Sequence, residues 1–304
     1  MPTKKPDLSI VIVNFNTRKI THQCLESIYR SFRAYKSKNA PTFEIILIDN
    51  ASVKDDSASY FEAYAQKHKN IVYVANKTNT GFGPANNQGV KLAQAPYVLL
   101  LNSDTIILKD AIHRLFAYYK KNELSKHFIG PKLLNRDMTP QPSAAPFYTL
   151  PVVFGALFLR GDYWGLTRSS PRTLRKVGWV SGACIMTRKD YFEKVGGFDE
   201  TIFMYMEEVD LLYRAKKLGL HTYFYPKAKI VHLGSASSNG KTFPILQVYR
   251  GFLFFYKKHY TKWALFLLRC MLRLKAASAW FLGYIINNSY LKQTYAEAFH
   301  VAGQ

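Results

Sequence analysis

The chain is poor in cysteine, and its cysteines show no pairing pattern. Cys24, Cys184 and Cys270 are the only three among 304 residues, and they are odd in number and far apart. A disulfide framework needs an even, closely spaced set, and a structural zinc site usually has paired cysteines. The sequence therefore excludes both and favours a reducing compartment.

The beginning of the chain has no long apolar run. The apolar stretch there, 8–13, is too short for the core of a signal peptide, and no small-residue cleavage site follows it. We therefore expect a cytoplasmic protein whose first element is a strand.

Acidic residues are scarce relative to basic ones. The chain has 20 Asp and Glu against 42 Lys and Arg, which gives a net charge of +22. Such a balance favours anionic partners, namely nucleotide phosphates, acidic lipid headgroups or nucleic acid, without choosing among them. The hydrophobic fraction of 48% is ample for a core, and the length allows one large α/β domain with an appendage, or two modest domains.

Strands alternate with helices along the first hundred residues, which predicts an α/β fold with a doubly wound, mostly parallel sheet. Apolar runs predict strands at 8–14, 43–48, 71–75 and 97–101, with helices at 21–35, 57–68 and 88–93. From 131 to 176 the periodicity fades, which predicts a long irregular excursion over the site. Later elements are expected as a strand at 177–186, helices at 188–195 and 207–218, and short strands at 223–225 and 230–232.

Two acidic clusters lie about a hundred residues apart. Asn102-Ser103-Asp104 follows a buried strand, and Glu207-Glu208-Val209-Asp210 opens a helix. In open α/β sheets the carboxyl ends of the strands form the ligand-binding edge, so Asp104 is a candidate for a metal held on phosphates. The later glutamates are candidates for proton transfer. Helix capping by Asp104 and a solvated helix face for the glutamates are the alternatives.

Other polar and aromatic positions give weaker signals. Asp49 ends a strand and suits hydrogen bonds to a ribose or base, or simply a turn. Trp179 and Asp199 are candidates for contacts with a sugar acceptor. The alternatives are that Trp179 lies in the core and that Asp199 caps a turn. Four arginines of the excursion either clamp a diphosphate or form a solvated basic loop: Arg160, Arg168, Arg172 and Arg175.

Taken in order, the segments resemble the family 2 glycosyltransferases, which have the GT-A fold, and most of all their bacterial rhamnosyltransferase-like branch. The matching segments run from about residue 8 to 235: Ser9 to Asn16, Ile48 to Ser52, Asn79 to Asn86, Leu100 to Asp104, Gly182-Ala183, and Gly196 to Glu200 leading to Glu207 to Leu211.

The resemblance implies a role for each matching position. Asn14 and Asp49 would contact the nucleoside. The pyrophosphate and sugar would lie against Asn79, Gly81, Asn86 and the segment from Asn102 to Asp104, and Asp104 with His232 would hold Mn²⁺ or Mg²⁺. Glu208 would be the base, with Glu207 beside it, in an inverting reaction. Two positions depart from the family pattern. Asn102 stands in place of the first Asp of an Asp-x-Asp motif, and Glu208 stands in place of an Asp.

The last part of the chain, 241–304, differs from the domain at 1–240. It has nine Lys and Arg against one acid, Glu297, and many apolar and aromatic residues. Arg269, Arg273 and Lys275 interrupt its longest apolar stretch. We expect amphipathic helices lying on the inner face of the plasma membrane, with core or dimer helices and a spanning helix as alternatives.

The function expected from the resemblance is transfer of a sugar, rhamnose being the first candidate, from a dTDP- or UDP-linked donor. The acceptor would be a hydroxyl of a cell-surface glycan or lipid-linked molecule. A nucleotidyltransferase-like enzyme and an inactive glycan-binding relative are the alternatives. A nucleic-acid binder is not favoured, because the aromatic residues lie within apolar segments.

Overall fold

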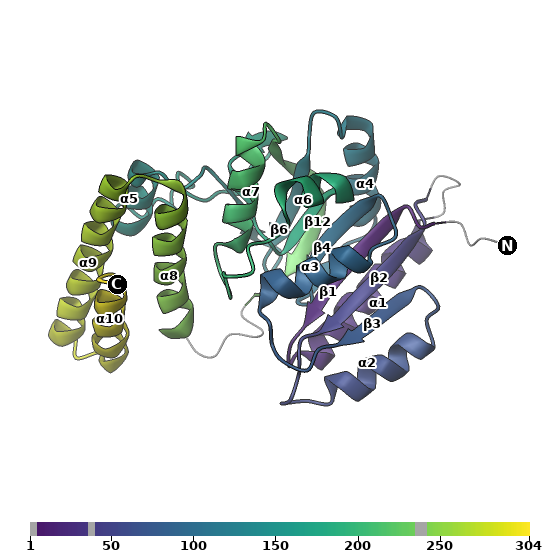
Figure 1. The fold of residues 1–304 in the computed structure, drawn as a ribbon, viewed down its shortest axis with the longest axis horizontal. Coiled ribbons are helices and arrows are strands. Elements are labelled where there is room, and N and C mark those ends of the chain that lie inside the picture. The colour runs from purple at the N-terminus through teal and green to yellow at the C-terminus, as the bar shows by residue number, and fades with distance from the viewer. Residues whose placement is uncertain (1–4, 36–39, 235–241) are drawn as a thin grey trace.

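A sheet of ten strands forms the centre of the computed structural model, which describes residues 5–35, 40–234 and 242–304 (Figure 1). Eight strands form its main path, in the order β3-β2-β1-β4-β11-β6-β12-β5. The strands of the sheet are β1 (Leu8–Asn14), β2 (Phe43–Asp49), β3 (Ile71–Ala75), β4 (Tyr97–Asn102), β5 (Thr105–Ile107), β6 (Phe128–Leu134), β7 (Pro140–Gln141), β9 (Arg175–Val177), β11 (Cys184–Arg188) and β12 (Thr222–His232). A separate pair is formed by β8 (Ala144–Ala145) and β10 (Trp179–Val180).

Helices cover both faces of the sheet, so the predicted doubly wound α/β architecture is confirmed (Figure 1). Strands β1, β2, β3 and β4 pair in parallel, as do β6 and β12, whereas β11 is antiparallel to its neighbours. One face packs on α1 (Arg18–Ala34), α2 (Ser57–Gln66) and α4 (Ala111–Asn122). The other packs on α3 (Phe82–Leu92), α6 (Lys189–Val195) and α7 (Glu207–Lys217). Burial on both faces explains the continuous apolar runs of the central strands.

The helix predicted at 88–93 begins earlier, at Phe82. In the sequence, Gly81 and Pro84 suggest that a helix would be interrupted here. However, Pro84 lies in the first helical turn, where a missing N–H costs no intrahelical hydrogen bond. Asn86 therefore lies on the helix, where its side-chain amide donates to the carbonyl of Phe82 at 2.9 Å.

The predicted irregular excursion contains regular structure. It includes most of β6, together with β7, β8 and α5 (Leu150–Phe158). The strand expected at 177–186 is divided into β10 and β11, and the two short strands expected near its end are one long strand, β12. Edge pairing supplies these strands with partners that lie far away in the sequence, and local periodicity does not reveal such partners.

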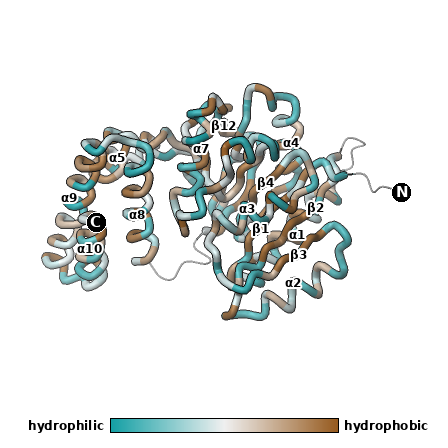
Figure 2. Tube along the Cα trace, viewed as in Figure 1, coloured by the Kyte–Doolittle hydropathy of each residue, from teal (hydrophilic) through white to brown (hydrophobic). Residues whose placement is uncertain are grey.

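The C-terminal helices form a small bundle beside the sheet domain (Figure 1). They are α8 (Thr242–His259), α9 (Lys262–Ile285) and α10 (Ser289–Val301). Phe252, Phe255 and Tyr256 of α8 are buried in the same core as α7, so α8 is continuous with the sheet domain. Apolar and polar residues alternate along α9 (Figure 2). Within the described residues, no helix has both the length and the apolar character that crossing a membrane requires.

Candidate functional site

Parallel pairing brings three polar strand ends together. In the register of β1 with β2, Asn14 lies opposite Asp49, and in the register of β1 with β4, Val13 lies opposite Asn102. These positions form the carboxyl edge of the sheet, where open α/β folds bind ligands.

Asn14 and Asp49 form one buried polar cluster at this edge. The Asn14 amide donates to Asp49 Oδ1 at 2.5 Å, and the Ser52 hydroxyl donates to the same oxygen at 2.7 Å. Both Asn14 and Asp49 are fully buried or nearly so. They lie at the predicted nucleoside side, but neither lines the pocket described below.

Asn50, which the sequence reasoning did not single out, holds the predicted pyrophosphate loop. Its amide donates to Asn79 Oδ1 at 2.8 Å and to the Gly81 carbonyl at 3.2 Å. Gly81 has a φ of +93°, and a Cβ there would lie 2.9 Å from the carbonyl oxygen of Phe203. A glycine is therefore required at this turn. Asn79, Gly81 and Asn86 do not line the pocket.

A pocket of about 340 Å³ lies next to this edge and brings the two acidic clusters together. Of the predicted residues it includes Asn102, Asp104, Trp179, Glu207, Glu208 and His232. The sequence separates these clusters by about a hundred residues, and the crossing of β4, β11 and α7 brings them to one cavity.

Asp104 and His232 face each other because β5 pairs with the end of β12. His232 Nε2 lies 3.3 Å from Asp104 Oδ1. The Gln141 amide donates its hydrogens to Asn135 and to the His232 carbonyl, which leaves its oxygen 2.7 Å from His232 Nδ1. Nδ1 therefore donates to Gln141, and Nε2, which is an acceptor unless it binds a second proton, faces the Asp104 carboxylate.

Two facing acceptors require either a second proton or a cation. In octahedral coordination at about 2.1 Å, neighbouring ligands lie about 3 Å apart, which the Asp104–His232 separation matches. Asn102 adds a buried side-chain oxygen without a hydrogen-bond partner. These donors fit Mg²⁺ or Mn²⁺ only with further oxygens from a ligand. In the described part of the chain, no group of three or more His, Cys, Asp or Glu side chains could hold a metal ion.

Glu207 and Glu208 open α7 after two residues with left-handed backbone, Tyr205 (φ 66°) and Met206 (φ 71°). Such strain is typical of functional sites, and the helix N-terminus favours negative charge. Burial raises the pKa of both carboxyls, and the charge of Glu208 raises the pKa of Glu207 further. One Glu207 oxygen is buried without a hydrogen-bond partner. Raised pKa values suit groups that exchange protons near neutral pH.

Aromatic and basic side chains close the opposite wall of the pocket. The Arg168 guanidinium lies 5.4 Å from the ring centroid of Trp179, and Tyr148 lies beside Trp179. Arg168 has a buried Nε without a partner, and its charge lowers the pKa of Glu208. Of the four arginines considered from the sequence, Arg168 alone lines this pocket.

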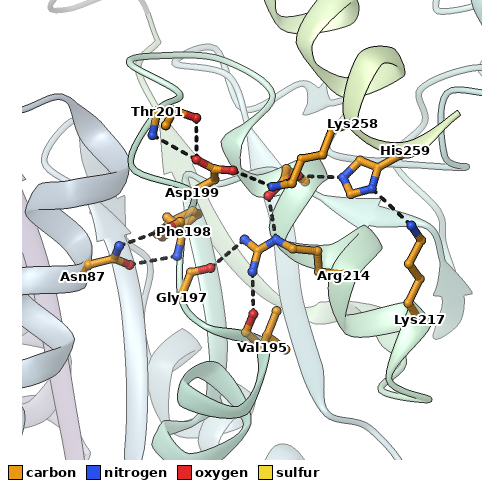
Figure 3. A network of polar contacts seen from close by, with 11 residues as sticks. Asn87, Val195, Gly197, Phe198, Asp199, Thr201, Arg214, Lys217, Lys258 and His259 are labelled. Carbon is orange, nitrogen blue, oxygen red and sulfur yellow. Dashed lines mark hydrogen bonds and ion pairs between the residues drawn. The ribbon is translucent and has the colours of Figure 1, made fainter. Parts of the chain in front are cut away.

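Figure 3 shows a second polar network, which includes Arg214 and Lys217 of α7 and Lys258 and His259 of α8. Asp210 has no exposed surface and accepts from Arg214 at 2.7 Å, Lys258 at 2.8 Å and His259 at 2.7 Å. Asp199 pairs with the same Lys258 at 2.5 Å. Asp199 does not line the pocket, so its predicted contact with an acceptor stays a prediction that this placement does not favour.

Helix α8 supplies two pocket residues that the sequence reasoning missed, Val248 and Phe252. No motif marks them. The sequence shows only that α8 is rich in aromatic residues and that its last turn is basic, with Lys258 and His259.

The sheet order and the polar carboxyl edge of the sheet are those of a GT-A fold. The solved structure of GalNAc-T7 with UDP, GalNAc and Mn²⁺ superposes with a TM-score of 0.59 at 15% identity, over 82% of this chain and 48% of that one. The model of the family described as Glycosyl transferase family 2 matches residues 9–196. The chain belongs to this family, which sets the nucleotidyltransferase alternative aside.

Relatives in sequence support the rhamnosyltransferase-like branch. The chain is 27% identical to the low-salt glycan biosynthesis hexosyltransferase Agl10 of Haloferax volcanii, over 71% of this chain and 63% of that protein. It is 29% identical to the N-acetylglucosaminyl-diphospho-decaprenol L-rhamnosyltransferase of Mycobacterium tuberculosis, over 65% and 68%. It is 26% identical to the rhamnosyltransferase WbbL of Escherichia coli, over 73% and 82%.

Proposed function

We propose that this chain transfers a sugar from a nucleotide diphosphate to an acceptor hydroxyl with inversion at the anomeric carbon. The observation that carries the proposal is a single pocket with Asp104 and His232 on one side and the Glu207–Glu208 pair on another. The first group suits a divalent cation that binds the donor diphosphate, and the second suits the acceptor hydroxyl.

Glu208 is the proposed base. It accepts the proton of the acceptor hydroxyl while the hydroxyl oxygen bonds to the anomeric carbon and the bond to the diphosphate breaks. The electron pair leaves with the diphosphate. Arg168 lies in the same pocket and stabilises negative charge. A divalent cation on Asp104 and His232, with the Asn102 oxygen nearby, would add Lewis-acid stabilisation of the leaving group.

Donor identity is tested by ligand-induced stabilisation, since a ligand that binds only the folded chain raises its melting temperature. The screen compares UDP, dTDP, UDP-glucose and dTDP-rhamnose, each with and without Mn²⁺ or Mg²⁺. Because two relatives are named rhamnosyltransferases, we expect the largest shift with dTDP-rhamnose and metal. Equal shifts for all nucleotides would contradict a dTDP-sugar donor.

The proposed acceptor is a lipid-linked glycan, and the proposed location is the inner face of the plasma membrane. The relative from M. tuberculosis is named for a diphospho-decaprenol acceptor. Helix α9 exposes apolar residues with lysine and arginine close by, the composition of a helix that lies on an anionic bilayer. The exposed set includes Trp263, Phe266, Leu267, Leu274 and Phe281.

An inactive glycan-binding relative remains the competing function, because Asn102 and Glu208 depart from the family pattern. Measuring sugar transfer and donor hydrolysis distinguishes the two. Turnover that depends on Glu208 supports the enzyme, whereas donor binding without any turnover supports the inactive relative.

A further inference from the structure

A second and larger cavity, of about 630 Å³, lies outside the catalytic pocket. Its volume is in the range of about 300–1,000 Å³ that is usual for small-molecule sites. Its lining is formed by the following residues: 145–147, Thr149, Val152, Gly165, Leu166, Ser169, 175–178, Lys216, Leu220, His221 and Thr222.

The two cavities share one wall. Adjacent residues of the same segments point to different sides: Tyr148 lines the catalytic pocket, whereas Phe147 and Thr149 line the second cavity. Likewise, Trp179 lines the catalytic pocket, whereas Gly178 lines the second cavity. The wall is held by backbone hydrogen bonds, including Gly178 N to the Ala145 carbonyl at 2.9 Å.

The charge of the second cavity has one sign. Arg175 and Lys176 from β9 and Lys216 from α7 line it, and none of its lining residues is acidic. Within the described ranges, no carboxylate lies at ion-pair distance from any of these three cations. Uncompensated cations around a cavity favour an anionic ligand, and arginine favours phosphate in particular.

The remaining lining is largely apolar. Phe147, Val152, Leu166 and Leu220 contribute to it, and Leu166 is 71% exposed although it borders a cavity. The Lys216 ammonium lies 5.3 Å from the Phe147 ring centroid, so charge and apolar surface meet inside one site. A simple inorganic anion would leave this apolar surface in water, whereas a ligand with an apolar chain would cover it.

We propose that this cavity binds an amphiphilic phosphate, in which an apolar chain carries a phosphate or diphosphate. Arg175 and Lys216 hold the phosphate, and the apolar lining holds the first part of the chain. The bound ligand would order the wall from which Tyr148 and Trp179 enter the catalytic pocket. The proposal concerns binding alone and does not depend on which sugar the catalytic pocket transfers.

The test is calorimetric titration of the full chain with farnesyl diphosphate, below the concentration at which it forms micelles. We expect saturable binding at one site, with inorganic pyrophosphate and farnesol each binding more weakly. The double variant Arg175→Gln/Lys216→Gln should weaken binding by roughly tenfold or more, because two charge-assisted contacts are lost. Val152→Trp should weaken it by filling the apolar part.

Matched controls separate this site from general charge and from the catalytic pocket. Arg172→Gln removes an arginine of the same segment that does not line the cavity, and it should leave affinity unchanged. Thermal melting shows whether each variant is folded. If one of the two cavity variants is unfolded, the other still tests the site. Unchanged affinity in both cavity variants, displacement by UDP, or binding only to phosphatidylglycerol vesicles would overturn the proposal.

Discussion

At the scale of single residues, the two neighbouring glutamates of α7 are distinguishable by substitution. Glu208→Gln removes the proposed base, so kcat should fall by about 10²–10⁴-fold while donor affinity is retained. Glu207→Gln keeps the base and should retain far more activity. Initial rates with saturating donor test this, and equal losses in both variants would contradict the assignment of the base to Glu208.

Glu207 also gives a stability prediction with a defined pH dependence. Folding raises its pKa above the ordinary value of 4.5, first through burial and then through Glu208. The charged form is therefore disfavoured in the folded state, and this carboxyl lowers stability as the pH rises above about 4.5. Glu207→Gln should raise the free energy of unfolding by about 1–3 kcal/mol at pH 8. Denaturant melts at pH 8 and at pH 4 check this, and the gain in the free energy of unfolding should vanish at pH 4.

His232 carries the prediction for metal. Its Nε2 faces Asp104, so His232→Gln should raise the Mn²⁺ concentration needed for half-maximal activity by about tenfold or more. Gln141→Leu, which removes the acceptor of Nδ1–H, should produce a smaller shift in the same direction. Titration of activity with Mn²⁺ measures both. An unchanged metal requirement in His232→Gln would contradict a ligand role.

At the scale of elements, Asp210 connects α7 to Lys258 and His259 of α8. Burial alone would raise the pKa of Asp210, but hydrogen bonds from His259 and Lys258 and the charge of Arg214 outweigh it and lower the pKa to about 2. This stabilisation is present above the ordinary value of 3.8 and is lost as the pH falls towards 2. Asp210→Asn removes the carboxylate that Arg214 and His259 contact, whereas Lys258 keeps Asp199.

The expected cost of Asp210→Asn is about 3–5 kcal/mol at pH 7, measured by denaturant melting, because one partner of a buried charge cluster is removed. The difference from the parent should shrink as the pH falls towards 2, where Asp210 of the parent becomes protonated. Asp190→Asn is the control, since Asp190 pairs with Arg188 on the exposed surface. A cost similar to that of the control would contradict the connection.

The sequence predicted elements well where the pattern was local. The alternation of apolar runs with helical patterns predicted β1 to β4 and the carboxyl edge of the sheet, because burial on both faces produces continuous apolar runs. It could not predict β5, β7 or the β8–β10 pair, which are short and depend on partners distant in sequence. The acidic clusters were found from their positions at element ends, whereas Val248 and Phe252 look like ordinary core residues until α8 is placed.

At the scale of the whole molecule, the domain boundary expected near residue 240 stays a prediction, and the helix that follows it contributes to the candidate pocket. Helix α8 lines the pocket and holds α7, whereas α9 exposes the apolar surface. Removal of residues 241–304 should therefore abolish transfer even to a soluble acceptor, besides releasing the chain from membranes. Loss of membrane binding in such a truncation is not evidence about α9 alone.

Surface substitutions on α9 isolate the membrane contribution. Trp263, Phe266 and Phe281 are 77%, 55% and 61% exposed, so their replacement by serine removes apolar contact with a bilayer at little cost to folding. The triple variant should lose sedimentation with phosphatidylglycerol vesicles yet keep activity on a soluble acceptor, because α8 is intact. Leu124→Ser, at a residue 81% exposed on the sheet domain, is the matched control. If the triple variant sediments as the parent does, these three side chains are not what binds the membrane.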